Sequence, residues 1–191
     1  KNVKTFEIWE IDQKLKPQLE KSFPNSEIKI CDSIEILNKS QKIRKFDLVL
    51  IDNPMNVFGI KKNSFEYCEH FDVIKNIPKL MDKEVIVIFL VNKKPFFFKK
   101  LKKENTLWRK RRQQFYGNVN TNDMSVEFLT SFYRELFRSM GLITIFSNII
   151  PRHSPHPDYF IFMLRKNEKQ NENSLKTLDW LSLDPLFSRN Q

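Results

Sequence analysis

The chain has 191 residues, 40% of them hydrophobic, and a formal net charge of +10. This length and composition fit one globular domain and exclude wholesale disorder. No apolar run approaches the eighteen residues that span a membrane, and no signal-peptide pattern is present. The two cysteines form no disulfide framework, so we expect a reduced, cytoplasmic setting.

Strand and helix patterns alternate through the first half of the chain. Strands are expected over 6–11, 27–31, 46–51 and 84–91, with helices over 13–23, 34–45 and 65–80 between them. Pro17 is tolerated only in the first turn of its helix, and Ser33 is the expected cap of the next. The apolar runs 46–51 and 84–91 are typical of parallel strands buried on both faces. The alternation predicts right-handed crossovers and a parallel sheet.

The second half opens with an aromatic and basic segment, 93–123, in which Leu101, Trp108 and Phe115 form one helical stripe. A helix over 125–140 is expected to stop at Gly141. Two apolar strands follow, joined by a polar loop, and predict an antiparallel hairpin at the sheet edge.

Acidic residues end three successive expected strands. Glu10 and Asp12 follow the first strand, Asp32 the second and Asp52 the third. Ligands of open α/β sheets bind beyond the carboxyl ends of the strands, so these acids indicate a site. The alternative is that each acid caps the helix or turn that follows it.

Several of these segments resemble class I S-adenosylmethionine methyltransferases and the related spermidine synthases. WEID, ICDSIEIL and FDLVLIDNP resemble the second, third and fourth strands of that family, and FYRELFRSMGLITIFSNII with DYFIFMLRK is similar to its last helix and reversed hairpin. The resemblance implies a doubly wound, mostly parallel α/β sheet with a C-terminal antiparallel hairpin. It also implies a domain over 1–166, followed by a polar linker and a short apolar segment over 167–191.

The resemblance further implies S-adenosylmethionine as cofactor and assigns roles to the strand ends. Glu10, with Asp12 beside it, would bind the ribose hydroxyls, because a carboxylate accepts from two vicinal hydroxyls. Asp32 would face the adenine amino group, with Ile34 in the apolar slot for the ring, and Ser33 between them is counted with the cofactor-binding residues. The catalytic floor would be formed by three consecutive residues, Asp52, Asn53 and Pro54. The sequence DNPM lacks the second proline and the aromatic residue of the DPPY-type motif, so the methyl acceptor stays open.

By this resemblance the chain is a Rossmann-like methyltransferase fold that lacks its first βα unit, the strand and glycine-rich turn with which family members begin. Only about five residues precede the first expected strand, and the three glycines, Gly59, Gly117 and Gly141, lie far from it. Only glycine lets a backbone approach the cofactor so closely. We therefore expect either that an upstream segment or a partner subunit completes the fold, or that cofactor binding has been lost.

The basic charge is concentrated between Lys93 and Arg112, where ten basic residues and one acid give +9. Such a field selects polyanions, and nucleic acid, RNA or DNA, is the expected partner ahead of a membrane surface. The residues expected to contact it are Lys99, Lys100, Lys102, Lys103, Trp108, Arg109, Arg111 and Arg112. The alternative is an amphipathic helix whose stripe packs inward and whose charges are only solvated.

Three other functions stay open from the sequence. One is a non-catalytic scaffold of the same fold that binds nucleic acid or a partner subunit. Another is a receiver-like domain with Asp52 as phospho-acceptor, although that fold has no place for a terminal hairpin. A third is polyamine synthesis, which the basic segment disfavours. His153 and His156 lie in a proline-rich loop, and no metal site is expected there.

Overall fold

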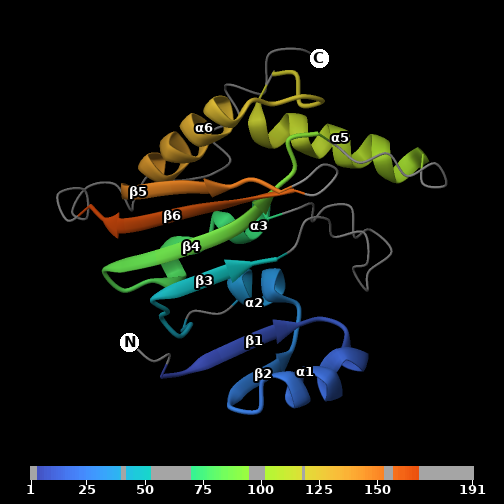
Figure 1. Ribbon diagram of the computed structural model, residues 1–191, viewed down its shortest axis with the longest axis vertical. Coiled ribbons are helices and arrows are strands. Elements are labelled where there is room, and N and C mark those ends of the chain that lie inside the picture. Colours follow the sequence, from blue (N-terminus) through green and yellow to red (C-terminus); the bar gives the residue numbers. More distant parts are fainter. Residues whose placement is uncertain are drawn as a thin grey trace.

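The computed structural model describes residues 4–39, 42–52, 70–94, 102–117, 119–152 and 157–167, and for 102–107 it describes the backbone only. Strands and helices alternate up to β4, and two helices then lead into a hairpin (Figure 1). The described elements are β1 (Phe6–Glu10), the 3-10 helix η1 (Gln13–Leu15), α1 (Lys16–Ser22), β2 (Ser26–Ile30), α2 (Ser33–Lys39), β3 (Leu48–Ile51), α3 (Phe71–Ile74), α4 (Ile77–Leu80), β4 (Glu84–Val91), α5 (Lys102–Tyr116), α6 (Val126–Ser139), β5 (Leu142–Ile150) and β6 (Asp158–Lys166).

Local sequence signals explain most helix boundaries. Pro17 lies in the first turn of α1, where its missing N–H costs nothing. Helix α6 is capped by Ser125, whose Oγ accepts a hydrogen bond from the Phe128 amide at 3.1 Å. The helix ends two residues before Gly141, which has a φ of 74°. The described part of the single helix expected over 65–80 is instead two short helices, α3 and α4. Pro78 lies in the first turn of α4 and would clash with the carbonyl of Ile74 in a continuous helix.

The six strands form two sheets rather than one. β1 and β2 pair in parallel, while β3, β4, β6 and β5 form a four-stranded sheet in that order. β3 and β4 are parallel, and β6 runs antiparallel to both β4 and β5. The α/β class and the C-terminal antiparallel hairpin expected from the sequence are confirmed. The hairpin has no counterpart in a receiver domain.

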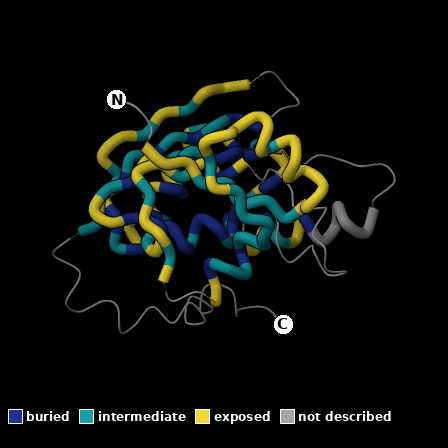
Figure 2. Tube along the Cα trace, turned by 90° about the horizontal axis from the view of Figure 1, so that it is seen from below, coloured by how far each residue is buried: buried dark blue, intermediate teal, exposed yellow. Residues whose placement is uncertain are grey.

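The core lies on one face of the strands. In Figure 2 the buried segments, in dark blue, lie mostly in the interior, with exposed segments, in yellow, around them. Side chains of α2, α3, α4, α5 and α6 join one buried cluster with Val87, Phe89, Phe160 and Phe162 of the sheet. Trp9 of β1 packs against the same cluster, whereas Phe6 lies on the opposite face of β1, 5.5 Å from the ring of Phe23 after α1. The expectation that β3 is buried on both faces is wrong, because Leu48 and Leu50 are exposed.

Candidate functional site

Glu10 and Asp32 lie at the carboxyl ends of two neighbouring parallel strands. β1 and β2 are in register from Phe6 with Ser26 to Glu10 with Ile30, and the Cys31 amide donates to the Glu10 carbonyl at 2.7 Å. Glu10 is partly buried, and its Oε1 accepts from the Asp12 amide at 2.8 Å. The structure therefore brings the two carboxylates predicted for ribose and adenine to one edge.

Both Asp12 and Asp32 also do what the capping alternative predicted. Asp12 is exposed, and its Oδ1 accepts from the Lys14 amide at 2.9 Å at the start of η1. The Oδ1 of Asp32 accepts from the amides of Ile34 at 2.9 Å and Glu35 at 3.2 Å. Asp32, and not the predicted Ser33, thus caps α2, and Ser33 is the partly buried first residue of that helix. Capping holds the Asp32 carboxylate in a fixed position.

Ile34 follows Asp32 and Ser33 in the first turn of α2. Its side chain is only 2% exposed and packs in the core between α2 and the sheet. An apolar residue in the first turn of an amphipathic helix is drawn inward, and the adenine slot assigned to Ile34 stays a prediction.

Asp52 follows β3 directly and is exposed. It is therefore at the same carboxyl edge as Glu10 and Asp32, since β1, β2 and β3 point the same way in Figure 1. Asn53 and Pro54, predicted beside it, lie outside the described residues.

The basic segment is largely engaged within the protein where the structure describes it. Lys93 pairs with the buried carboxylate of Asp158 at 2.8 Å, and Arg111 pairs with Asp72 at 2.7 Å. Lys94 lies 3.4 Å from Asp123. Arg109 and Lys110 are exposed. Lys99 and Lys100, and the side chains of Lys102 and Lys103, lie outside the described residues.

Arg112 and Trp108 were predicted to contact nucleic acid, and both predictions are wrong in this structure because both side chains are buried. The Arg112 guanidinium donates to the carbonyls of Asn92 at 2.7 Å and Thr121 at 3.3 Å. It also lies 5.7 Å from the centre of the Trp108 ring and 5.4 Å from that of Tyr116. The buried stripe of α5 is therefore Trp108, Arg112 and Tyr116, and it ties this helix to the end of β4.

His70 is a buried polar residue that the sequence did not single out. Its Nε2 hydrogen-bonds to the Tyr133 hydroxyl, which lies 2.7 Å from the hydroxyl of Tyr116. Phe89 lies 4.8 Å from the His70 ring between centroids. Burial lowers the pKa of His70 to about 3, so the imidazole is neutral at physiological pH. The density of aromatic residues in 115–137 was the only sequence signal of such a cluster.

Glu7 is a charged residue with a buried side chain, on the face of β1 that carries Trp9. Its carboxylate accepts from Lys29 Nζ at 2.7 Å and from the Trp9 indole, and Arg44 lies 3.7 Å away. Burial by itself would raise the pKa of Glu7, but the hydrogen bonds and positive charges outweigh it and the pKa is lowered. Glu7 therefore serves to hold β1, β2 and the segment before β3 together.

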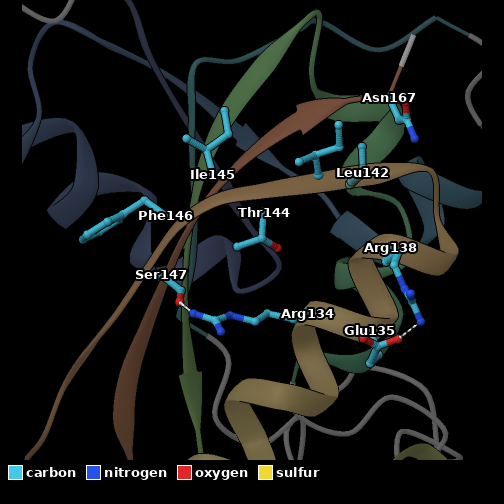
Figure 3. A pocket seen from close by; sticks show the side chains of 10 residues that line it. Arg134, Glu135, Arg138, Leu142, Thr144, Ile145, Phe146, Ser147 and Asn167 are labelled. Carbon is cyan, nitrogen blue, oxygen red and sulfur yellow. Dashed lines mark hydrogen bonds and ion pairs between the residues drawn. The ribbon is translucent and has the colours of Figure 1, made fainter. Parts of the chain in front are cut away.

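A shallow groove lies away from these acids, between α6 and the outer strand β5 (Figure 3). Arg134 donates to Ser147 at 2.7 Å across it, and Arg138 pairs with Glu135. Glu10, Asp32 and Asp52 do not line this groove.

Within the described ranges, no group of three or more His, Cys, Asp or Glu side chains is arranged to hold a metal ion. The same ranges contain no helix with the length and hydropathy that a membrane span requires.

No family model matches the chain, and no curated protein is significantly similar to it. Solved structures do resemble it. The N-methyltransferase NodS from Bradyrhizobium japonicum WM9 is 9% identical, with a TM-score of 0.45 over 86% of this chain and 75% of that one. A putative SAM-dependent methyltransferase from Streptococcus mutans is 10% identical, with a TM-score of 0.48 over 86% and 39%.

Magnesium protoporphyrin IX methyltransferase (ChlM) from Synechocystis PCC 6803, solved with bound SAH, is 14% identical, with a TM-score of 0.45 over 85% of this chain and 64% of that one. All three are described as methyltransferases, the group of enzymes that the sequence motifs resemble. Sequence identities of 9–14% and TM-scores below 0.5 describe a similar arrangement of the chain and nothing about function. The function is therefore proposed from the residues of this chain.

Proposed function

We propose that this chain carries the ribose and adenine side of an S-adenosylmethionine site and transfers a methyl group once that site is complete. The observation that carries the proposal is the pair of carboxylates, Glu10 and Asp32, at the ends of two strands in register. A third carboxylate, Asp52, ends β3 at the same edge.

The donor set fits the polar half of such a cofactor. One oxygen of Glu10 is engaged by the Asp12 amide, and the remaining acceptor positions suit a vicinal diol. Asp32 is held by the amides of α2 through Oδ1, and its second oxygen suits an amino group. Carboxylates fixed in this way lose little freedom on binding, which favours affinity.

Methyl transfer places few demands on acid–base groups and many on position. When bound, the cofactor would supply an electrophilic methyl group. Asp52 is exposed at the end of β3, where it would orient the acceptor and take the proton that the acceptor loses. The role of the neighbouring Asn53 and Pro54 in the same floor is part of this proposal.

An anionic acceptor such as RNA or DNA is supported by Arg109 and Lys110, which are the exposed basic residues of α5 that the structure describes with their side chains. The contact between Arg112 and the Asn92 carbonyl holds this helix beside the carboxyl end of β4. Replacing Arg109 and Lys110 by Ser should weaken binding of single-stranded RNA and reduce its salt dependence. Arg138→Ser on α6 is the matched control, and equal losses in both variants would contradict the assignment.

Calorimetric titration with S-adenosylhomocysteine tests the site itself. Glu10→Gln keeps the shape of the side chain and removes its charge, so affinity should fall roughly ten- to a hundredfold, the effect of one charged hydrogen bond. Glu20→Gln, at an exposed position of α1, is the matched control and should leave affinity unchanged. Unchanged affinity in Glu10→Gln would refute the role given to this carboxylate.

A further inference from the structure

The outer edge of β5 is exposed and apolar. β5 is the last strand of the four-stranded sheet, and within the described residues it pairs on one side only, with β6. Its sequence, LITIFSNII, contains no charged residue and no proline, two of the usual means by which edge strands avoid pairing with other chains. Ile143 is 46% exposed, Ile145 42% and Phe146 53%. An apolar edge of this length is typical of a surface that another polypeptide segment covers.

The groove between α6 and β5 has this edge as one of its walls (Figure 3). The groove has a volume of about 680 Å³, which is room for several large side chains. In Figure 3, Arg134 and Arg138 lie on the α6 side, and Ile145 and Phe146 on the β5 side. A guanidinium has five N–H donors, so each arginine can bind a carboxylate beside its present partner. The groove therefore suits a segment that combines large apolar side chains with acidic ones.

The described part of the chain ends at this groove. Asn167 lines it, and the Asn167 amide donates to the Gly141 carbonyl at 2.9 Å, directly before β5 begins. Residues 168–191 lie outside the described part of the chain. Their first part, 168–174, is entirely polar and spans at most about 25 Å when extended, whereas the groove follows β5 over 142–147, about 17 Å. The segment after this polar stretch can therefore reach every part of the groove.

The segment 175–187 has the chemistry that the groove requires. Its sequence is LKTLDWLSLDPLF, in which leucine, tryptophan and phenylalanine alternate with short polar stretches. Apart from Lys176, its charged residues are Asp179 and Asp184, opposite in sign to the two arginines of the groove. A second copy of the chain fits less well, because its net charge of +10 brings more positive charge to these arginines. A tethered segment also has an effective concentration in roughly the millimolar range, which a separate chain does not.

We propose that 175–187 docks in the groove between α6 and β5 of its own chain. Its apolar side chains pack against Ile143 and Ile145, and its two acids face the arginines of α6. The contact covers the edge of β5 that would otherwise be free to pair with other chains. It is separate from the proposed function, because the start of β5 and the amino end of β4 pair with the same end of β6. The groove thus lies away from the carboxyl edge that carries the proposed cofactor residues.

Hydrogen exchange of the full 1–191 chain tests the contact. Trp180→Ser with Leu183→Ser removes two large apolar side chains of the segment, so exchange of the amides over 142–147 should become at least about tenfold faster. Leu48→Ser with Leu50→Ser, at exposed positions of β3, is the matched control and should leave exchange over 142–147 unchanged. Unchanged exchange in the segment variant would overturn the proposal. Protection of 142–147 that grows with protein concentration would also overturn it, since the occupant would then be a second copy.

Charge reversal tests whether the acids of the segment face the arginines of the groove. Arg134→Glu with Arg138→Glu should speed exchange over 142–147, because the segment is then repelled. Asp179→Lys with Asp184→Lys, added to the same protein, should restore exchange to within about threefold of the wild type. This restoration separates docking from the loss of the hydrogen bond between α6 and β5, which the new lysines do not replace. Exchange that stays fast in the protein with all four changes would overturn the proposal.

Lys14→Glu with Lys21→Glu is the matched control for the change of charge. Both lysines are exposed and lie beside β1 and β2, far from α6 and β5 in Figure 1. Their reversal changes the net charge by the same amount and should leave exchange over 142–147 as it is in the wild type. Equally fast exchange in this control would overturn the proposal, because the effect would then follow the net charge of the chain and not the arginines of the groove.

Discussion

The protonation of His70 gives the sharpest test of the packing. Its imidazole is fully buried among Phe71, Phe89, Phe115 and Tyr133, and its pKa is lowered to about 3 by desolvation. In the unfolded chain the pKa returns to an ordinary value of 6.5. Between these two pKa values the unfolded state binds a proton at His70 and the folded state does not, so acid favours unfolding.

The size of the effect follows from the two pKa values. The stabilising contribution is fully present above pH 6.5 and falls as the pH drops toward about 3, by about 1.4 kcal/mol for each pH unit in that window. Between pH 7.5 and pH 5, the free energy of unfolding should therefore fall by about 2 kcal/mol through His70 alone. This window lies above the range in which lowered carboxyl pKa values, such as that of Glu7, contribute.

Urea unfolding followed by tryptophan fluorescence at pH 7.5, 6 and 5 measures this slope. His70→Phe fills the same aromatic surroundings without a titrating group, so the variant should lose about 2 kcal/mol of the pH dependence between the two ends. Its stability at pH 7.5 should drop, because the Tyr133 hydroxyl loses its partner. Equal slopes in the two proteins would show that His70 is not buried as neutral imidazole.

Three further changes test other contacts. Arg112→Lys should lower the free energy of unfolding by about 2–4 kcal/mol, because a lysine cannot replace the two carbonyl contacts and the stacked guanidinium. The control Arg109→Lys changes an exposed residue and should lower it by less than about 0.5 kcal/mol, with both variants measured by urea titration. Glu7→Gln should destabilise the protein by about 1–3 kcal/mol at pH 7, and the difference should shrink below pH 4.5 as the pH falls through the lowered pKa of Glu7. Asp32→Ala should remove the cap of α2 at a cost of about 1 kcal/mol by thermal unfolding, and a loss of ligand affinity without this cost would contradict the capping role.

Patterns that depend on neighbouring residues were predictable from the sequence. The alternation of strands and helices, the first-turn position of Pro17 and the hairpin after Gly141 all follow from local chemistry. The break between α3 and α4 was also readable, because Pro78 cannot continue a helix past Ile74. The apolar pattern that continues through 65–80 predicted one helix there and hid this break.

Features that depend on tertiary contacts were not predictable. The guanidinium of Arg112 can be buried because it donates to two backbone carbonyls from other segments, those of Asn92 and Thr121. No local sequence pattern predicts these contacts. The same holds for His70, whose partner Tyr133 is 63 residues away. The apolar run of β3 predicts a strand buried on both faces, yet Leu50 is exposed. An apolar run shows that a strand can be buried on both faces, but whether it is buried depends on which other elements pack against it.

The central claim, a cofactor site at the carboxyl edge, is tested most directly by hydrogen exchange of the protein with and without saturating S-adenosylhomocysteine. The amides of Asp12 and Ile34 donate to the carboxylates of Glu10 and Asp32, so their exchange reports on these side chains. The account predicts that the ligand slows exchange at both amides and leaves exchange in the groove between α6 and β5 unchanged. Slowing at Ser147 and its neighbours in that groove, with none at Asp12 and Ile34, would contradict it.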